Sequence, residues 1–282
     1  MQTQRPIKMI LQRQPTLEGA GVRLFRVFGH REVPRLDPFL MLDDFRSDTP
    51  ADYLKGFPFH PHRGIETITY VLKGDVAHQD SLGNCGTISA GDVQWMTAGS
   101  GIVHQEMPQG DDQGAMHGFQ LWANLPAARK MMPPRYRGIV AGQIPEVGLE
   151  GGIRIKVIAG ALGGVKGPAD DIAIDPQYLD CYLPAGQSYS HETEPSYTAL
   201  AYVIQGQGTT DSTTIENGTL VQFGPGDHLK LRAGDRALRF LLLTGKPLHE
   251  PVAWQGPIVM NTDQELETAF REYRQGTFIK DH

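Results

Sequence analysis

Two short histidine motifs are the residues of this chain best suited to bind a metal. His60 and His62 stand two positions apart, and later in the chain His104 and Glu106 repeat that spacing. On an extended strand, side chains two positions apart point to the same face, so each pair could reach one ion from one side. If two such strands were neighbours in a small barrel, they would supply three imidazole nitrogens and one carboxylate oxygen. That donor set suits Fe, Mn, Cu or Ni.

Two alternatives stay open at the level of the residues. A lone His-x-His in a Gly- and Pro-rich loop is more often a hydrogen-bonded pair than a ligand set, and here the second motif favours a metal. Glu66 is a second candidate for the carboxylate ligand, because it shares the strand parity of His60 and His62. The two cysteines, Cys85 and Cys181, form no C-x-x-C motif, which argues against a thiolate zinc site and a disulfide framework.

The elements that must position these residues are predicted to be short strands. They are rich in β-branched and aromatic residues and are bounded by Gly, Pro, Asp or Asn. The predicted ranges are 22–28, 66–72, 87–88, 93–96, 118–123, 154–159, 178–183, 199–204 and 238–243. Helical periodicity appears in the tail, at 261–273, behind a capping box formed by Thr262 and Glu265. The pattern predicts an all-β chain with a short C-terminal helix.

An internal repeat divides these strands into two sets. Residues 69–74 (TYVLKG) align with 201–206 (AYVIQG), and further along 89–92 (SAGD) align with 224–227 (GPGD). Two similar antiparallel β-barrels are therefore expected. We place the N-terminal metal-binding barrel at 1–135 and a degenerate C-terminal barrel, with the terminal helix, at 136–282. A Pro- and Gly-dense stretch near 133–152 fits the link between them.

The second copy lacks the ligand residues. In this alignment Glu192 and Glu194 stand where the first histidine pair stands, and Arg239 and Leu241 replace the second motif. Four ligands cannot be assembled there. The second barrel is therefore expected to act as a lid or scaffold.

Composition narrows the function further. The 282 residues carry a formal net charge of −6, which offers no basic surface for nucleic acid. No stretch of about 18 apolar residues is present to span a membrane. We expect a soluble, cytoplasmic protein. We also expect a monomer, because two fused barrels bury much of the surface that a single barrel would use to dimerise.

Two long segments resemble the signature stretches of the pirin family, within the cupin superfamily. They are GFPFHPHRGIETITYVLKG at 56–74 and GDVQWMTAGSGIVHQEMP at 91–108, and further likeness lies at 36–43, 118–126 and 250–262. The resemblance implies a bicupin, with two face-to-face antiparallel β-barrels and a metal in the N-terminal one only. It also implies His60, His62, His104 and Glu106 as the ligands. Fe(II) is the expected metal, with Mn, Cu, Ni and Zn as alternatives.

Bacterial proteins that resemble this one are associated with quercetin 2,3-dioxygenase activity. The resemblance therefore implies a metal-dependent dioxygenase that opens a flavonol with O2 and releases carbon monoxide. Glu106 is expected to be its catalytic base, accepting the proton of the flavonol 3-hydroxyl. Aromatic and sulfur side chains near the two motifs are expected to hold the rings: Phe57, Phe59, Trp95, Met96 and Phe119.

A regulatory protein is the competing prediction. The pirin family also includes members that contact transcription factors or metabolic enzymes, with the metal and its oxidation state setting the shape of a surface. The acidic composition is compatible with such a protein partner. Both functions use the same metal site, so ligand spacing does not separate them.

Overall fold

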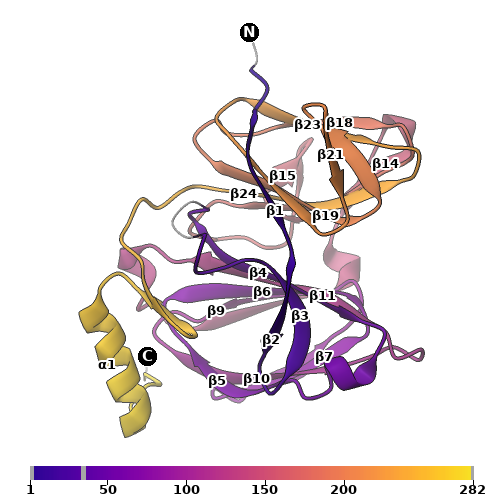
Figure 1. Cartoon of the computed structure of the whole chain (residues 1–282). Helices are drawn as coiled ribbons and strands as arrows, with labels where there is room; N and C mark the ends of the chain where they lie inside the picture. Colours follow the sequence, from indigo (N-terminus) through magenta and orange to yellow (C-terminus); the bar gives the residue numbers. More distant parts are fainter. Residues whose placement is uncertain (1–2, 33–35, 281–282) are drawn as a thin grey trace. The chain divides into compact units, whose positions relative to one another are not determined.

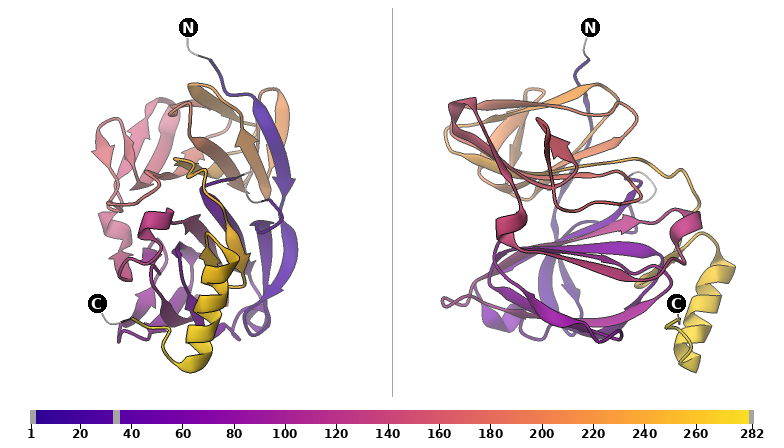
Figure 2. Two further views of the ribbon diagram at one scale, coloured as in Figure 1. Left: turned by 90° about the vertical axis from the view of Figure 1, so that its left-hand side faces the viewer. Right: turned by 180° about the vertical axis from the view of Figure 1, so that it is seen from behind.

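The computed structural model describes residues 3–32 and 36–280, which form two compact units built mainly of antiparallel β-strands (Figures 1 and 2). The N-terminal unit joins residues 14–141 with those from 248 onward. The C-terminal unit joins the residues up to 13 with 142–247. The only α-helix of the described residues, α1 (Asp263–Gln275), belongs to the N-terminal unit. No helix among the described residues is both long and apolar enough to cross a membrane.

The large sheet of the N-terminal unit has seven strands. They are β2 (Gln14–Glu18), β3 (Val22–Phe28), β4 (Phe39–Ser47), β6 (Ile65–Lys73), β9 (Val93–Thr97), β11 (Met116–Asn124) and β12 (Arg135–Ile139). Their order across the sheet is β12-β9-β6-β11-β4-β3-β2. A four-stranded sheet of order β5-β10-β7-β8 completes the unit. Its strands are β5 (Phe57–His62), β7 (Asp75–Asp80), β8 (Cys85–Ile88) and β10 (Ile102–Gln109).

The C-terminal unit repeats this arrangement. Its seven-stranded sheet has the order β1-β22-β19-β24-β17-β14-β13. These strands are β1 (Ile7–Gln12), β13 (Glu146–Leu149), β14 (Ile153–Ala159), β17 (Gln177–Leu183), β19 (Thr198–Gln205), β22 (Thr219–Phe223) and β24 (Leu238–Gly245). Its four-stranded sheet has the order β18-β23-β20-β21. These strands are β18 (Ser188–Glu192), β20 (Gln207–Thr210), β21 (Thr213–Glu216) and β23 (His228–Ala233).

Short elements complete the chain. Two small hairpins are formed by β15 (Ala161–Leu162) with β16 (Val165–Lys166) and by β25 (Ala253–Gln255) with β26 (Ile258–Met260). The 3-10 helices are η1 (Pro50–Asp52), η2 (Ala127–Arg129), η3 (Ala141–Gln143) and η4 (Glu150–Gly152). Helix α1 begins at the predicted capping box, where the Thr262 hydroxyl accepts from the Glu265 amide.

Each unit takes one element from the opposite end of the chain. Strand β1 pairs with β22 in the C-terminal unit, where it occupies the sheet position that β12 holds in the N-terminal unit. Helix α1 packs on the hairpin β25–β26 of the N-terminal unit. The division predicted at residue 135 placed both segments in the other domain. Contacts between segments far apart in the sequence determine which unit β1 and α1 join. The local sequence of either element does not predict those contacts.

Strand order also revises the alignment of the repeat. All nine predicted strands are present, and β19 does correspond to β6. The next equivalent turn, however, is at Gly218 rather than Gly226. Gly218 precedes β22 and donates to Val203, just as Gly91 precedes β9 and donates to Val71. Strand β23, not β24, is therefore the counterpart of β10.

The interiors of the two units differ. In the C-terminal unit, apolar side chains from both sheets fill the space between them, including Tyr189, Val203, Leu229, Leu231 and Phe240. In the N-terminal unit the apolar clusters are smaller, and buried polar residues share the interior with them. The space left in the N-terminal unit holds the two histidine motifs.

Buried Lys130 ties three segments of the N-terminal unit together. Its Nζ donates to Gly64 O at 2.9 Å, Asn124 Oδ1 at 2.7 Å and Val259 O at 3.0 Å. We expect Lys130→Met to lower the free energy of unfolding by about 3 kcal/mol, because three buried acceptors lose their donor. Urea denaturation checks this, with exposed Lys246→Met as the control. Equal stability of the two variants would contradict it.

Candidate metal centre

Strands β5 and β10 bring the two histidine motifs together. They are antiparallel neighbours, with His104 opposite His60 and Ile102 opposite His62. The register shifts between His104 and Glu106, so that Glu106 stands opposite Phe57. The predicted pairing of the two motifs is therefore present in the fold. His62, His104 and Glu106 are buried, and His60 is half-buried at the cavity wall.

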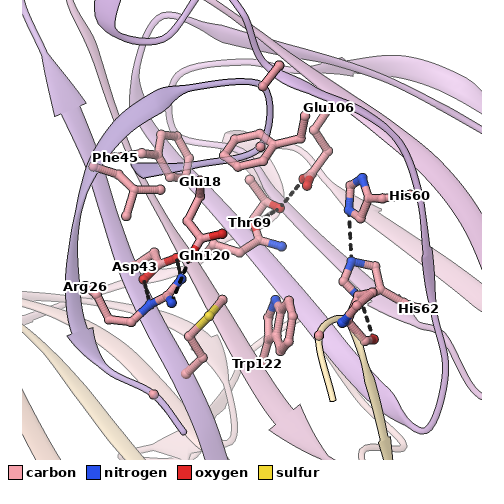
Figure 3. Close-up of a pocket in the computed structure, with 18 of the residues that line it drawn as sticks. Glu18, Arg26, Asp43, Phe45, His60, His62, Thr69, Glu106, Gln120 and Trp122 are labelled. Atoms are coloured by element: carbon pink, nitrogen blue, oxygen red, sulfur yellow. Dashed lines mark hydrogen bonds and ion pairs between the residues drawn. The ribbon is translucent and has the colours of Figure 1, made fainter. Parts of the chain in front are cut away.

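Three imidazole nitrogens converge at one point. His60 Nε2 lies 3.0 Å from His62 Nε2 and 3.1 Å from His104 Nε2 (Figure 3). These three residues form the one group of candidate metal ligands found among the described residues. Burial lowers the pKa of His60, and it lowers the pKa values of His62 and His104 well below the usual value. The neutral form, which a metal ion requires, is favoured at all three positions.

The hydrogen bonds on the far side of the rings show why a cation fits between them. His60 Nδ1 faces Pro58 O at 2.9 Å, and His62 Nδ1 faces Pro257 O at 3.1 Å. A carbonyl oxygen only accepts, so both Nδ1 atoms carry the proton and both Nε2 atoms carry a lone pair. Two lone pairs 3.0 Å apart make no hydrogen bond with each other. A metal ion held by both nitrogens would remove this conflict.

Glu106 lies beside the histidines. Its Oε2 is 4.0 Å from His104 Nε2, and its Oε1 is 3.0 Å from the hydroxyl of Thr69. Burial raises the pKa of the Glu106 carboxyl to about 7, and the hydrogen bond from Thr69 opposes that rise. The carboxyl lines the same cavity as His60 and His62. Glu106 is thus placed to complete a set of three nitrogens and one oxygen.

Glu66 points away from this cluster. Its carboxylate accepts from Thr97 at 2.6 Å and does not line the cavity. On β6 it is three positions from Thr69, which faces the cavity, so the two side chains are on opposite faces of the sheet. The even spacing between His62 and Glu66 does not put their side chains on one face, because the chain turns between β5 and β6. Gly64 makes that turn with φ +78°, and a Cβ there would lie 2.0 Å from Val259 O.

Thr69 connects Glu106 to Gln120. Its hydroxyl oxygen is 3.0 Å from Glu106 Oε1 and 2.6 Å from Gln120 Oε1. One hydroxyl proton cannot be donated to both oxygens. A half-turn of the Gln120 amide resolves this, because its NH2 then donates to Thr69 and the hydroxyl donates to the carboxylate. The hydrogen bond from Thr69 therefore fixes one oxygen of the Glu106 carboxyl group.

A cavity of about 680 Å³ opens beside the histidines. Its walls are mainly apolar, with polar groups at both ends. The apolar and aromatic lining includes Leu24, Met41, Phe45, Phe57, Val76, Trp122 and Trp254. Of the five side chains predicted to hold the substrate rings, Phe57 alone lines the cavity. Phe59 is 50% exposed, and Trp95, Met96 and Phe119 are fully buried in the core instead.

The C-terminal segment supports the site in a way that sequence reasoning missed. Pro257, in the turn between β25 and β26, supplies the carbonyl that orients His62. The next residue after His62, Arg63, donates to Glu272 of α1 at 2.7 Å and to Phe278 O at 2.8 Å. Helix α1 therefore packs against the strand end that presents His62. The sequence gives no local signal for contacts across such a separation.

The equivalent positions of the C-terminal unit hold no ligand set among the described residues. On β18 and β23 the buried side chains are Tyr189, His191, Leu229, Leu231 and Ala233. His191 bonds with Tyr189 through Nδ1 and with Gln177 through Nε2, so both ring nitrogens have protein partners. The residues at these positions differ from Glu192, Glu194, Arg239 and Leu241, which the sequence alignment had placed there.

Comparison with known proteins places these observations in a family. Residues 21–123 match the family model of pirin, and residues 178–279 match that of the pirin C-terminal cupin domain. A pirin-like protein of Caulobacter vibrioides is 46% identical over 97% of this chain and 99% of its own length. A Pseudomonas aeruginosa protein named "Putative quercetin 2,3-dioxygenase" is 44% identical, over 93% of this chain and 94% of its own.

A solved structure agrees with the sequence comparison. Quercetin 2,3-dioxygenase from Acinetobacter baumannii superposes with a TM-score of 0.90 at 34% identity, covering 98% of each chain. The bicupin fold expected from the sequence is thereby confirmed. A bacterial pirin, YhhW of Escherichia coli, solved in complex with nickel(II), shares the fold at 21% identity with a TM-score of 0.65. The fold and the three histidines together fit a divalent metal ion.

Proposed function

The chain belongs to the pirin family, and on that premise we propose that it is a metal-dependent dioxygenase that cleaves a flavonol such as quercetin at the 2,3 position with O2. The observation that carries the proposal is the cluster of three neutral imidazoles and one carboxyl at the wall of a largely apolar cavity. Relatives named for this activity support it.

The cavity suits a flat aromatic ligand. Its volume of about 680 Å³ is within the range of about 300 to 1,000 Å³ that small-molecule sites span. Trp122 and Trp254 stand side by side with ring centroids 6.0 Å apart, and Trp122 lies edge to face with His62 at 5.0 Å. A fused ring system could stack along this wall and present its oxygen atoms to the histidines.

We propose His60, His62, His104 and Glu106 as the metal ligands and Fe(II) as the metal. Mn, Cu, Ni and Zn are alternatives that the same donors accept. A bound first-row ion would supply a Lewis acid and a redox partner for dioxygen. The protein contributes a largely apolar wall, fixed tautomers of His60 and His62 and a carboxyl group beside them.

Glu106 is the group we assign to proton transfer. The substrate's 3-hydroxyl must lose a proton before electron density can pass to dioxygen. Glu106 lines the cavity next to the histidines, so its carboxylate can accept the proton of a hydroxyl group that approaches them. The hydrogen bond with Thr69 fixes the direction of its carboxyl.

Aerobic turnover of quercetin tests the proposal. Protein reconstituted separately with Fe(II), Mn(II), Cu(II) or Ni(II) is expected to bleach the visible absorbance of quercetin with at least one ion. The His60→Ala variant should not. Stoichiometric metal binding without turnover by any ion would overturn the proposal.

One contact favours the regulatory function as the second candidate. Arg63 joins the strand end next to His62 to helix α1 through Glu272. A change of charge at the metal could therefore shift α1, which is largely exposed. Metal binding without turnover, as above, would support this candidate and direct the search to a protein partner.

Thr69→Val tests how Glu106 is held. The variant keeps a similar shape and loses the hydroxyl that bonds to Glu106 and Gln120. We expect kcat to fall about tenfold, from the loss of one hydrogen bond to a charged group. Bound metal should stay unchanged. Steady-state kinetics with metal analysis check this, and Thr69→Ser should restore most of the rate. An unchanged kcat in Thr69→Val would contradict it.

We place the protein in the cytoplasm. Cys85 and Cys181 are both free, as expected in a reducing compartment. That it acts as a monomer stays a prediction.

A further inference from the structure

A charged cluster lies at the end of the cavity away from the histidines. Arg26 donates through Nε and Nη2 to the two oxygens of Asp43, at 2.9 and 2.8 Å. Its Nη1 lies 2.8 Å from Glu18 Oε1. All three side chains line the cavity. In Figure 3, Arg26 and Asp43 are on the left, His60 and His62 are on the right, and Gln120 and Thr69 lie between them.

Among the residues that the structure describes, this cluster keeps hydrogen-bonding capacity that no side chain or backbone group uses. A guanidinium has five N–H donors, and the contacts to Asp43 and Glu18 occupy three of them. Within 3–32 and 36–280, one donor on each Nη atom has no partner. Each carboxylate oxygen also keeps a lone pair. The side chains of Arg26 and Glu18 are 30% and 39% exposed, so a ligand in the cavity can reach them.

The charges of the cluster select the kind of ligand. Two carboxylates and one guanidinium sum to −1. The other ionisable side chains that line the cavity within the described residues are His30, His60, His62 and Glu106. An anionic ligand would meet net repulsion. A neutral phenol fits, because its O–H donates to a carboxylate while its oxygen accepts from Arg26. Two adjacent hydroxyls would use both kinds of group at once.

We propose that Arg26, Asp43 and Glu18 form a subsite for neutral hydroxyl groups on the ring of a polyphenol that lies farthest from the metal. The proposal rests on the proposed function, since it assumes that the other end of the ligand faces the histidines. It makes this cluster the part of the site that selects among aromatic substrates. A catechol ring is its best match.

A purely structural role is the alternative. The cluster joins β2, β3 and β4, yet backbone pairing already connects these strands, with Arg26 directly opposite Asp43. An ion pair needed only for the fold could lie outside the cavity. The test therefore needs a measurement that responds to loss of the subsite but does not respond in the same way to a loss of protein stability.

Ligand binding to the metal-loaded protein without dioxygen provides that measurement. Quenching of tryptophan fluorescence reports it, because Trp122 and Trp254 line the cavity. Three flavonols serve as probes: quercetin with its catechol ring, an analogue whose phenyl ring has no hydroxyl group, and an analogue with a carboxylate on that ring. The variants are Glu18→Gln, Arg26→Lys and, as matched control, Glu146→Gln on the exposed strand β13.

We expect wild type to bind quercetin about tenfold more tightly than the unhydroxylated analogue. Glu18→Gln should weaken quercetin binding about threefold and strengthen binding of the carboxylate about threefold. Arg26→Lys should reduce the preference for quercetin, because a lysine lacks the forked donors. The control should match wild type.

The outcomes separate this inference from the proposed function. If wild type shows no preference for the catechol, or Glu18→Gln shifts all three probes equally, the subsite is wrong. Selective binding without any turnover would uphold the subsite and overturn the dioxygenase. Turnover of quercetin without selective binding would uphold the dioxygenase and overturn the subsite.

Discussion

Replacing His104 with alanine is expected to remove the metal and, with it, quercetin turnover. His104 Nε2 is 3.1 Å from His60 Nε2, so the variant deletes one of the three nitrogens that converge. Altering even a group outside the ligand shell costs about 10- to 100-fold in metal affinity, so loss of a ligand should cost more than about 100-fold. Metal content after desalting and steady-state kinetics measure the effect.

Stability data separate ligand loss from misfolding in this variant. In the metal-free protein alanine removes the 3.1 Å contact of His104 Nε2 with His60 Nε2 and leaves a small cavity at this buried position. The metal-free variant should therefore fold but be less stable than metal-free wild type by about 2 kcal/mol. Added metal at about 1,000 times Kd should stabilise wild type by about 4 kcal/mol and leave the variant unchanged. His228→Ala, on β23 of the C-terminal unit, is the control and should behave as wild type. A His104→Ala protein that keeps stoichiometric metal would refute the assignment.

The histidines could be predicted from the sequence because their geometry is local. A spacing of two residues fixes the face of a strand, and each motif lies within one strand, β5 or β10. The repeat TYVLKG and AYVIQG likewise marks one strand and its Gly turn in each unit. The alternation of side chains along one strand depends only on the backbone of that strand. Motifs this short therefore predict correctly which side chains share a face.

The rest of the site depends on contacts between distant segments. Trp95 and Phe119 are on strands near the motifs, but they alternate to the face of the sheet that does not line the cavity. Trp254 enters the cavity from a hairpin that comes more than a hundred residues later. The charged cluster of Arg26, Asp43 and Glu18 needs the pairing of three strands. None of these placements follows from the spacing of nearby residues.

Parity arguments failed where the chain turned between the residues compared. Glu66 and His62 are four positions apart, an even number, yet the turn at Gly64 lies between their strands. The second copy shows the same error at a larger scale. There the segment 224–227 resembled the turn before β9 but precedes β23. Residues on one strand can be compared by parity, and residues on either side of a turn cannot.

A pair of matched substitutions resolves the two carboxylates that the sequence left open. Glu106→Gln and Glu66→Gln each remove one negative charge from a buried carboxyl without changing its shape. Glu106→Gln should lower kcat about 100-fold or more, because general base catalysis contributes about 10²- to 10⁴-fold. Some metal should remain, since the three imidazoles are untouched. Metal analysis and steady-state kinetics on both variants test this.

Glu66→Gln should keep its metal and most of its activity. Its carboxylate accepts from Thr97 on the face of β6 away from the cavity, so the change should alter stability by about 1 kcal/mol and leave the chemistry in place. Because the two variants carry the same chemical change, only position distinguishes them. If Glu66→Gln lost turnover while Glu106→Gln kept it, the carboxylate would have been assigned to the wrong strand. An equal loss of kcat in both variants would mean that the total charge of the N-terminal unit sets the rate, and not a general base at position 106.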